Sequence, residues 1–334
     1  MSDAPLAVTP GEPAGVGVDL ALGLWAARAP DSPPFFLIDD PERVAARARL
    51  LGIPAALTPI DDPSEAVPAF PTALPVLRHG FPAESIPGRP DPVNGPATVE
   101  AITRAVDLVR AGRAAAVVTN PIQKETLYQA GFSHPGHTEY LAALSGPEVV
   151  PVMLLASPEL KVVPVTIHIP LAEVPRALTT EKILTTARIT ADAMRRDFGI
   201  AAPRLALAGL NPHAGEGGAL GREDGAVIAP AVAALRAEGI DARGPLPADT
   251  LFHEEARATY DVVLGMYHDQ VLVPIKTLDF WGGVNVTLGL PFVRTSPDHG
   301  TALTLAGTGK ARIDSLRAAV AMARSMAARR AAAR

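Results

Sequence analysis

Three of the eight histidines occur just after apolar runs that are typical of buried strands: His168 in VTIHIP, His213 in LAGLNPHAGE and His268 in VVLGMYHDQ. Because the carboxyl ends of parallel strands meet at one edge of a sheet, we expect the three imidazoles to converge there. Three imidazoles with open coordination positions suit a catalytic divalent metal. Any one of them alone would be an ordinary hydrogen-bonded surface histidine. The three together favour a metal site.

A second group of polar residues lies in the segment 260–307, which opens with an apolar strand pattern at 262–266. The glycines and prolines that follow predict a repeatedly turning backbone and not a helix. Lys276 and Arg294, with Asn285 between them, would bind an oxyanion such as phosphate or carboxylate. A metal beside a hydroxyl makes its deprotonation easier. These residues therefore indicate a polar, anionic, hydroxyl-bearing small molecule as the substrate.

Other segments each allow two interpretations. The glycine-rich loop at 11–17 either presents backbone N–H groups to an anion or is a tight strand-to-helix turn. A helix is expected to begin near Glu139. Thr138 and Glu139 either cap it, or His137, Thr138 and the helix N-terminus hold a phosphate or carboxylate. Residues 119–124 directly follow a strand, where ligand sites collect.

Bulk composition limits the class of protein. A chain of 334 residues with 48% hydrophobic and 19% charged residues predicts two ordinary domains with buried sheets. The net charge of −5 argues against nucleic-acid partners, and no apolar run is long enough for a membrane span. There is no cysteine, so a metal must use histidines and carboxylates. With no signal-peptide pattern at the N-terminus, we expect a cytoplasmic protein.

Strand and helix patterns alternate along most of the chain, which predicts an α/β fold with a mostly parallel sheet. The expected strands are 6–8, 35–39, 114–118, 152–155, 162–167, 205–210 and 262–266. The expected helices are 41–51, 98–111, 181–196, 224–238 and one from 311 onward. The proline-rich stretch 53–96 predicts irregular or antiparallel structure.

The motifs, taken in order, resemble those of the 4-hydroxythreonine-4-phosphate dehydrogenase family of pyridoxal phosphate biosynthesis. They are TPGEPAGVGVDL, TNPIQKETL, PGHTEYLA, NPHAGEGGALGRED, YDVVLGMYHDQVLVPIK and GVNVTLGLPFVRTSPDHGTALTLAG. The resemblance implies a two-domain α/β fold like that of isocitrate and isopropylmalate dehydrogenases, with an interdomain cleft, in a homodimer whose active sites lie at the subunit interface. Residues 1–125 plus about 290–334 would form the dinucleotide side, and residues 126–289 would carry the dimer interface and the metal site.

The resemblance also implies roles for individual residues. His168, His213 and His268 match ligands of a divalent metal (Zn, Mg, Co or Mn) shared between subunits. The substrate contacts would be His137, Thr138, Lys276, Asn285, Arg294 and Asp249. Lys276, His268 and Asp269 would take part in catalysis, with Lys276 as a proton carrier. NAD or NADP would bind at Asp298, His299, Gly300 and Thr301. Gln123 departs from the family pattern and leaves the role of Lys124 open.

The implied reaction oxidises 4-phosphooxy-L-threonine with NAD(P)⁺ and then removes CO₂, giving 3-amino-2-oxopropyl phosphate. Dehydrogenation of a related acid, such as 4-phospho-threonate, phospho-erythronate or a diol carboxylate, stays open. So does a metal-dependent lyase or hydrolase that uses no nicotinamide. A non-catalytic anion-binding module is disfavoured because it would leave the three histidines without a purpose.

Overall fold

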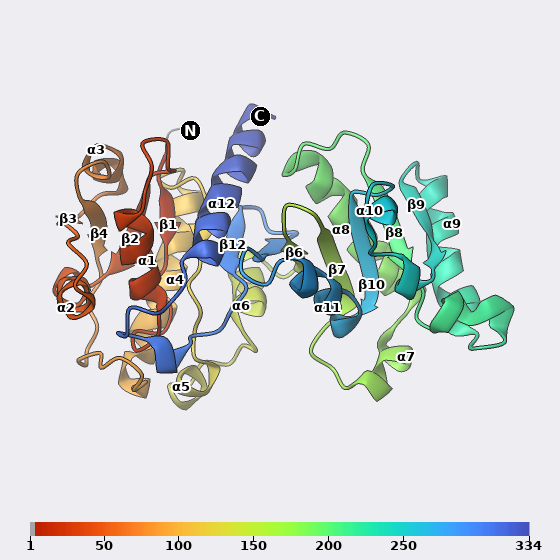
Figure 1. Ribbon diagram of the computed structural model, residues 1–334, viewed down its shortest axis with the longest axis horizontal. Helices are drawn as coiled ribbons and strands as arrows, with labels where there is room; N and C mark the ends of the chain where they lie inside the picture. The colour runs from red at the N-terminus through yellow and green to blue at the C-terminus, as the bar shows by residue number, and fades with distance from the viewer. Residues whose placement is uncertain (1–3, 334) are drawn as a thin grey trace. The chain divides into compact units, whose positions relative to one another are not determined.

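The computed structural model describes residues 4–333, which fold into two α/β units (Figure 1). Unit 1 comprises the residues up to Pro151 and those from Leu290 onward, and unit 2 comprises Val152–Gly289. The fold class expected from the sequence, an α/β chain with mostly parallel strands in two units, is confirmed.

Unit 1 contains a parallel sheet whose strands lie in the order β3-β4-β2-β1-β5-β12. The strands are β1 (Leu6–Val8), β2 (Phe35–Asp39), β3 (Leu57–Ile60), β4 (Leu74–Arg78), β5 (Val117–Val118) and β12 (Arg294–Pro297). The helices are α1 (Gly17–Ala26), α2 (Pro41–Leu51), α3 (Ala66–Ala69), α4 (Gly95–Arg110), α5 (Lys124–Gln129), α6 (His137–Ser145) and α12 (Asp314–Ala332). The C-terminal helix α12 packs against the N-terminal α1 and β1, and β12 pairs with β5.

Local signals define the ends of β2 and α2, both of which have the bounds expected from the sequence. The Asp40 carboxylate accepts hydrogen bonds from the amides of Glu42 and Arg43, and Pro41 occupies the first helical turn. Gly52 ends the helix in the left-handed conformation, with φ 64°. A cap, a proline and a glycine are readable from sequence, so the prediction succeeded here.

Unit 2 contains a mixed sheet in the order β11-β6-β7-β10-β8-β9, in which β6 runs antiparallel to both neighbours and the other pairs are parallel. The strands are β6 (Val152–Ala156), β7 (Lys161–Thr166), β8 (Arg204–Ala208), β9 (Asp241–Leu246), β10 (Val262–Tyr267) and β11 (Val284–Leu288). The helices are α7 (Val174–Ala177), α8 (Thr180–Arg196), α9 (Ala229–Ala237), α10 (Glu254–Arg257) and α11 (His268–Leu278). A π-helical turn, Asp224–Ile228, leads into α9.

Two expectations about local structure were wrong. Within the proline-rich stretch, β3 and β4 pair in parallel and not as irregular or antiparallel structure, because the connection through α3 is long enough for a crossover. After β10 the chain forms the helix α11, where a turning backbone was expected. Val271, Leu272 and Ile275 give this helix a buried face, and Pro274 is tolerated inside it.

Residues 126–151, which the sequence assigned to the second domain, belong to unit 1 in the structure. The physical reason is burial: Leu141 of α6 joins the hydrophobic core beneath α4, together with Ile102 and Val106. Among residues 4–333, no helix is both long and apolar enough to cross a membrane.

Candidate active site

In unit 2, β7, β10 and β8 are neighbouring parallel strands, and the segments that carry the three histidines follow their carboxyl ends. Tyr267, the last residue of β10, pairs with Thr166, the last residue of β7. The chain after each strand therefore emerges at the same sheet edge. The rings of His168 and His268 lie there with their centroids 5.5 Å apart.

Asp269 orients His268, because its Oδ1 lies 2.6 Å from His268 Nδ1. A carboxylate on Nδ1 fixes the tautomer that leaves Nε2 available as a ligand. Asp249 is exposed in the short helix Ala248–Thr250.

His213 lies on a strained turn. It opens a run of residues with left-handed backbone angles, namely His213 (φ 50°), Ala214, Gly215, Glu216 and Gly217. Non-glycine residues in this conformation cost of order 1 kcal/mol or more each and persist only where the surroundings enforce them. The position of His213 is therefore imposed by contacts around the turn.

These donors fit part of a divalent-metal site. Two neighbouring imidazoles, one held by a carboxylate, are suitable ligands for zinc or cobalt. Within the part of the chain that the structure describes, no group of three or more His, Cys, Asp or Glu side chains is arranged to hold a metal. A complete site therefore needs a further donor beyond the two adjacent rings.

Unit 1 contains a buried cationic side chain, that of Arg294, which is the first residue of β12 and reaches Thr119 just after β5. Arg294 is 4% exposed, and its Nε and Nη2 donate to Thr119 Oγ1 at 3.1 and 2.6 Å. Burial lowers the pKa of Arg294 to about 10, while the charge of Glu139 opposes this shift. The guanidinium is therefore positively charged at neutral pH.

His137, the first residue of α6, lies near this guanidinium. Its Nε2 is buried and has no hydrogen-bond partner among the described residues. Burial holds the pKa of His137 well below its ordinary value, and the charges of Arg294 and Lys124 add to the effect. A buried, unpaired ring nitrogen beside two cations is suited to an incoming oxyanion.

The start of α6 contains no side-chain cap, so the capping interpretation of Thr138 and Glu139 was wrong. The N-cap residue is Gly136, and no side chain accepts from the first helical amides. Lys124 runs past this glycine, because a Cβ at position 136 would lie 3.5 Å from Lys124 Cε and 3.8 Å from Nζ. Thr138 lies in the same first turn.

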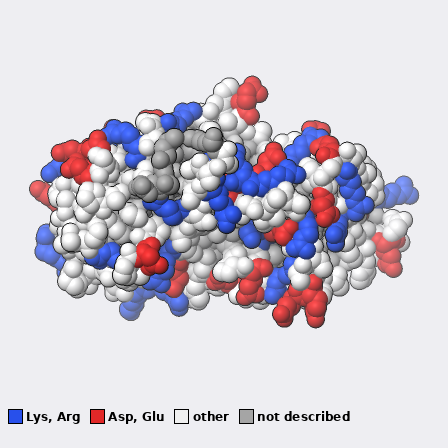
Figure 2. Space-filling model, turned by 90° about the horizontal axis from the view of Figure 1, so that it is seen from above, with Lys and Arg blue, Asp and Glu red and all other residues white. Residues whose placement is uncertain are grey.

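Acidic and basic side chains are interspersed over the face of the molecule shown in Figure 2. The formal charges, 30 basic against 35 acidic residues, are nearly balanced. Anion recognition would therefore depend on particular buried groups such as Arg294, and less on a broad electrostatic field.

The glycine-rich loop at 11–17 is a tight turn in which four amides donate to oxygen atoms of the protein itself. The amides of Glu12, Ala14, Gly15 and Val16 donate to Pro121 O, Glu12 Oε1, Glu12 O and Thr301 O respectively. Because these donors already have acceptors inside the protein, they are not available to a ligand.

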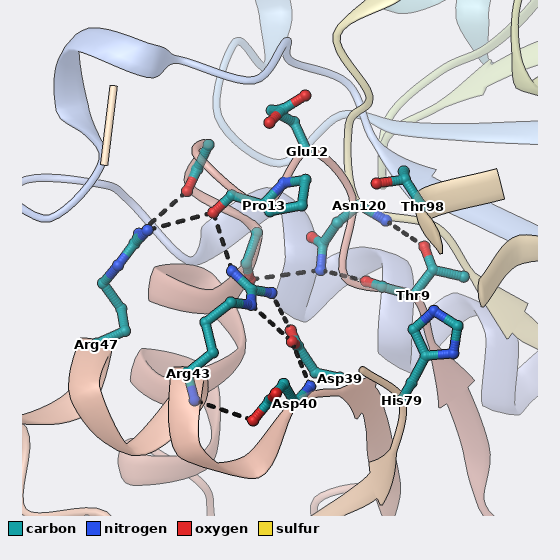
Figure 3. A network of polar contacts seen from close by, with 12 residues as sticks. Thr9, Glu12, Pro13, Asp39, Asp40, Arg43, Arg47, His79, Thr98 and Asn120 are labelled. Atoms are coloured by element: carbon teal, nitrogen blue, oxygen red, sulfur yellow. Dashed lines mark hydrogen bonds and ion pairs between the residues drawn. The ribbon is translucent and has the colours of Figure 1, made fainter. Parts of the chain in front are cut away.

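The loop is fixed from below by two arginines of α2 (Figure 3). Arg43 donates to Pro13 O at 2.9 Å and pairs with Asp39. Arg47 donates to Gly15 O at 3.2 Å and pairs with the buried Asp19. Asp39 lies at the end of β2, the position at which an acidic residue hydrogen-bonds the cofactor ribose in dinucleotide-binding folds. Here its carboxylate is fully buried and paired with Arg43, so it is not available to a ribose.

The segment expected to hold the cofactor packs directly on this loop. Thr301 accepts from the amide of Val16 through its carbonyl and donates from its hydroxyl to Gln123 Oε1 at 3.2 Å. Asp298 is anchored through its amide to Ser315 Oγ, while His299 and Gly300 are exposed. Close by, Asn120 Oδ1 is buried without a partner. Exposed loops and an unpaired polar atom at the carboxyl ends of parallel strands fit a nucleotide-binding edge.

The remaining predicted substrate residues lie in unit 2. Asn285 is on β11, and its Oδ1 is buried without a hydrogen-bond partner among the described residues. Lys276 is on α11, with its Nζ 6.0 Å from the centre of the exposed Phe280 ring. An unpaired amide oxygen is suited to a hydroxyl or amino group of a ligand.

Comparison with known proteins identifies the family. The family described as "Pyridoxal phosphate biosynthetic protein PdxA" matches residues 31–323. The chain belongs to the PdxA family. A relative from Methylorubrum populi, named 4-hydroxythreonine-4-phosphate dehydrogenase, is 58% identical over 334 residues, covering 98% of this chain and 95% of that protein.

Solved structures agree with the PdxA assignment. The crystal structure of 4-hydroxythreonine-4-phosphate dehydrogenase from Klebsiella pneumoniae has a TM-score of 0.88 and 38% identity, covering 97% of this chain and 99% of that chain. A terephthalate 1,2-cis-dihydrodioldehydrogenase from Burkholderia xenovorans has a TM-score of 0.65 and 28% identity, covering 96% and 98%.

Sequence reasoning missed three residues of this PdxA chain that contact predicted site residues or the segments carrying them, one in unit 1 and two in unit 2. Thr119 accepts from Arg294, although it was noted only as part of a segment after a strand. Gln270 links Met266 N, at 2.6 Å, to Gly209 O, at 2.6 Å, and so joins α11 to the end of β8. Asp224 is buried under the His213 turn. The sequence feature that could have identified Gln270 is its position two residues after His268 in the motif HDQ.

Proposed function

We propose that this PdxA-family chain is a 4-hydroxythreonine-4-phosphate dehydrogenase. It would oxidise the secondary alcohol of 4-phosphooxy-L-threonine with NAD⁺ or NADP⁺ and release CO₂, giving 3-amino-2-oxopropyl phosphate for pyridoxal phosphate biosynthesis. The observation that carries the proposal is the 58% identity to the Methylorubrum populi protein over nearly the whole of both chains.

The buried group of unit 1 supports a phosphorylated substrate. Arg294 would bind the phosphate with its charge, and His137 Nε2 would gain the hydrogen-bond partner that it lacks. Thr138 and Lys124 would add contacts at the start of α6. In unit 2, Asn285 and Lys276 would contact the polar groups near the reacting carbon, and Asp249 would approach the substrate at the subunit interface of the proposed homodimer.

His168, His213 and His268 would hold the divalent metal, with the set completed across the two subunits of the dimer. A bound divalent cation would stabilise negative charge on the substrate oxygen during both oxidation and decarboxylation. Asp269 would keep His268 Nδ1 occupied so that Nε2 faces the metal.

The proposed reaction proceeds in two balanced steps. Lys276 would accept the proton of the alcohol and the nicotinamide cofactor would accept its hydride, which would give a β-keto acid and NAD(P)H. The keto acid would then lose CO₂, and its α-carbon would take up a proton that Lys276 returns. The segment Asp298–Thr301 would hold the adenosine half of the cofactor.

The direct test is to mix the full chain with 4-phosphooxy-L-threonine, NAD⁺ or NADP⁺ and a divalent metal, and to follow reduced nicotinamide and CO₂. Formation of both products, abolished by a chelator and restored by metal, is expected. Metal-dependent turnover of 4-phospho-threonate or phospho-erythronate, without turnover of 4-phosphooxy-L-threonine, would overturn the proposed substrate. It would leave the proposed metal-dependent oxidation of a hydroxy acid in place. Absence of nicotinamide reduction with every alcohol would favour a metal-dependent lyase.

The likeness to the dihydrodioldehydrogenase supports a second candidate, the oxidation of a diol carboxylate without phosphate. The buried Arg294 and the unpaired His137 suit a carboxylate as well as a phosphate. Inhibition of the reaction by inorganic phosphate, competitive with substrate, would favour the phosphorylated substrate. Turnover of cis-diol carboxylates that is insensitive to phosphate would favour the second candidate.

A further inference from the structure

The left-handed turn that carries His213 wraps around one buried side chain, Asp224, which is 1% exposed. Its Oδ1 accepts from the amide of Leu210 at 2.7 Å, and its Oδ2 accepts from the amide of Asn211 at 3.2 Å. Oδ2 also accepts from Asn211 Nδ2 at 2.8 Å. One carboxylate therefore binds the two residues that lead into Pro212 and His213.

The glycines of the motif LAGLNPHAGE leave room for this carboxylate. A Cβ at Gly209 would lie 2.7 Å from Asp224 Oδ1 and 2.8 Å from Ala214 Cα. A Cβ at Gly215, where φ is 78°, would lie 3.1 Å from Asp224 Oδ2 and 2.8 Å from Gly221 O. Asp224 thus has contacts on both sides of His213, three amide hydrogen bonds before it and close packing after it.

The entry side of the turn has further hydrogen bonds at Gly209. Gln270 donates from Nε2 to Gly209 O and accepts from the amide of Met266, while the amide of Gly209 donates to Leu246 O at 2.7 Å. The entry to the turn is therefore tied to β10 and α11, which bear His268. Asp224 itself begins a π-helical turn, a feature frequently found at functional sites.

We propose that Asp224 is the positioning residue for His213, and that its buried carboxylate sets the affinity of the chain for a divalent metal by fixing the left-handed turn. The inference rests on the proposed function, in which His213 is a metal ligand. A turn with left-handed non-glycine residues relaxes once the groups that enforce it are removed. The imidazole would then have to be reordered each time a metal binds.

The test is a Co²⁺ titration of the chelator-treated full chain, followed by cobalt absorption, in wild type, Asp224→Asn and a control, Asp261→Asn. Asp261 accepts hydrogen bonds from the amide and the guanidinium of Arg204. This pair lies at the amino ends of β8 and β10, whereas the His213 turn follows the carboxyl end of β8, so the control removes comparable hydrogen bonds far from the turn. We expect Asp224→Asn to weaken Co²⁺ binding by roughly 10–100-fold. Asp261→Asn should bind within about twofold of wild type.

A second variant keeps the proposal testable if Asp224→Asn does not fold. Gly215→Ala retains the carboxylate but adds a methyl group against Gly221 O and Asp224 Oδ2, so it should also weaken Co²⁺ binding. Unchanged Co²⁺ affinity in either folded variant, or an equal loss in Asp261→Asn, would overturn the proposal while leaving the proposed function intact. Wild type that binds no Co²⁺ would overturn the metal site and this inference together.

Discussion

His168 and His268 lie with ring centroids 5.5 Å apart, just beyond the ends of the neighbouring parallel strands β7 and β10. The strand register produces this proximity, because Thr166 and Tyr267 pair across the sheet. Exchanging either histidine for alanine should therefore remove a donor from the same point.

His268→Ala should reduce metal-dependent turnover by at least about 100-fold, because a Lewis acid at the substrate oxygen supplies several kcal/mol. The matched control is His253→Ala. His253 forms a similar contact, Nδ1 to Glu255 Oε2 at 2.7 Å, but at an exposed surface. The measurement is kcat at saturating metal, together with bound metal per chain. Equal losses in the two variants would refute the special role of His268.

Arg294→Ala should raise the KM for the phosphorylated substrate by roughly 10–100-fold, since a hydrogen bond to a charged group contributes about 1.5–3 kcal/mol. Arg110→Ala serves as the control, because Arg110 is exposed and donates to the backbone carbonyls of Leu144 and Ser145. Steady-state kinetics at several phosphate concentrations would measure the effect. A normal KM with an intact fold would place the phosphate elsewhere.

Binding of a phosphate beside His137 should be accompanied by proton uptake. Burial and the charges of Arg294 and Lys124 hold the His137 pKa well below 6.5 in the free protein. An incoming dianion offsets those charges, raises this pKa and favours the protonated ring. Calorimetry of binding in buffers of different ionisation enthalpy measures the uptake, which His137→Asn should abolish.

The lowered pKa of His137 also predicts that the free energy of unfolding of the ligand-free protein depends on pH. Below the unfolded-state pKa near 6.5, the unfolded chain binds a proton at His137 that the folded chain does not. Stability should therefore fall as pH decreases from 6.5 toward the lower folded-state pKa. Thermal unfolding of His137→Asn across this range should show a shallower acid decline than wild type, and parallel curves would contradict the shift.

Gly15→Ala should weaken cofactor binding while leaving the substrate KM nearly unchanged. A Cβ at Gly15 would lie 3.0 Å from Thr301 O, so it would push the Asp298–Thr301 segment away from the loop. Gly80→Ala is the control, because a Cβ at that glycine meets no atom within 4 Å. The check is the KM for NAD⁺ or NADP⁺, and an unaltered value would remove this segment from the proposed cofactor site.

The sequence by itself determined the features whose causes are local. Asp40, Pro41 and Gly52 set the ends of α2, and the apolar runs placed His168 and His268 just after strands. The missed helix α11 shows the limit of such signals, since the glycines after it suggested turns while its buried face formed only against the sheet of unit 2.

Tertiary structure alone decided which of these residues meet. Thr119 and Arg294 are 175 positions apart and touch because β5 and β12 pair in parallel. In the sequence, Asp224 looks like an ordinary acidic residue near the start of a helix. Its three hydrogen bonds with amide groups form only because the 209–215 turn folds around it. Strand order and the burial of a carboxylate depend on contacts between distant segments, which no local pattern encodes.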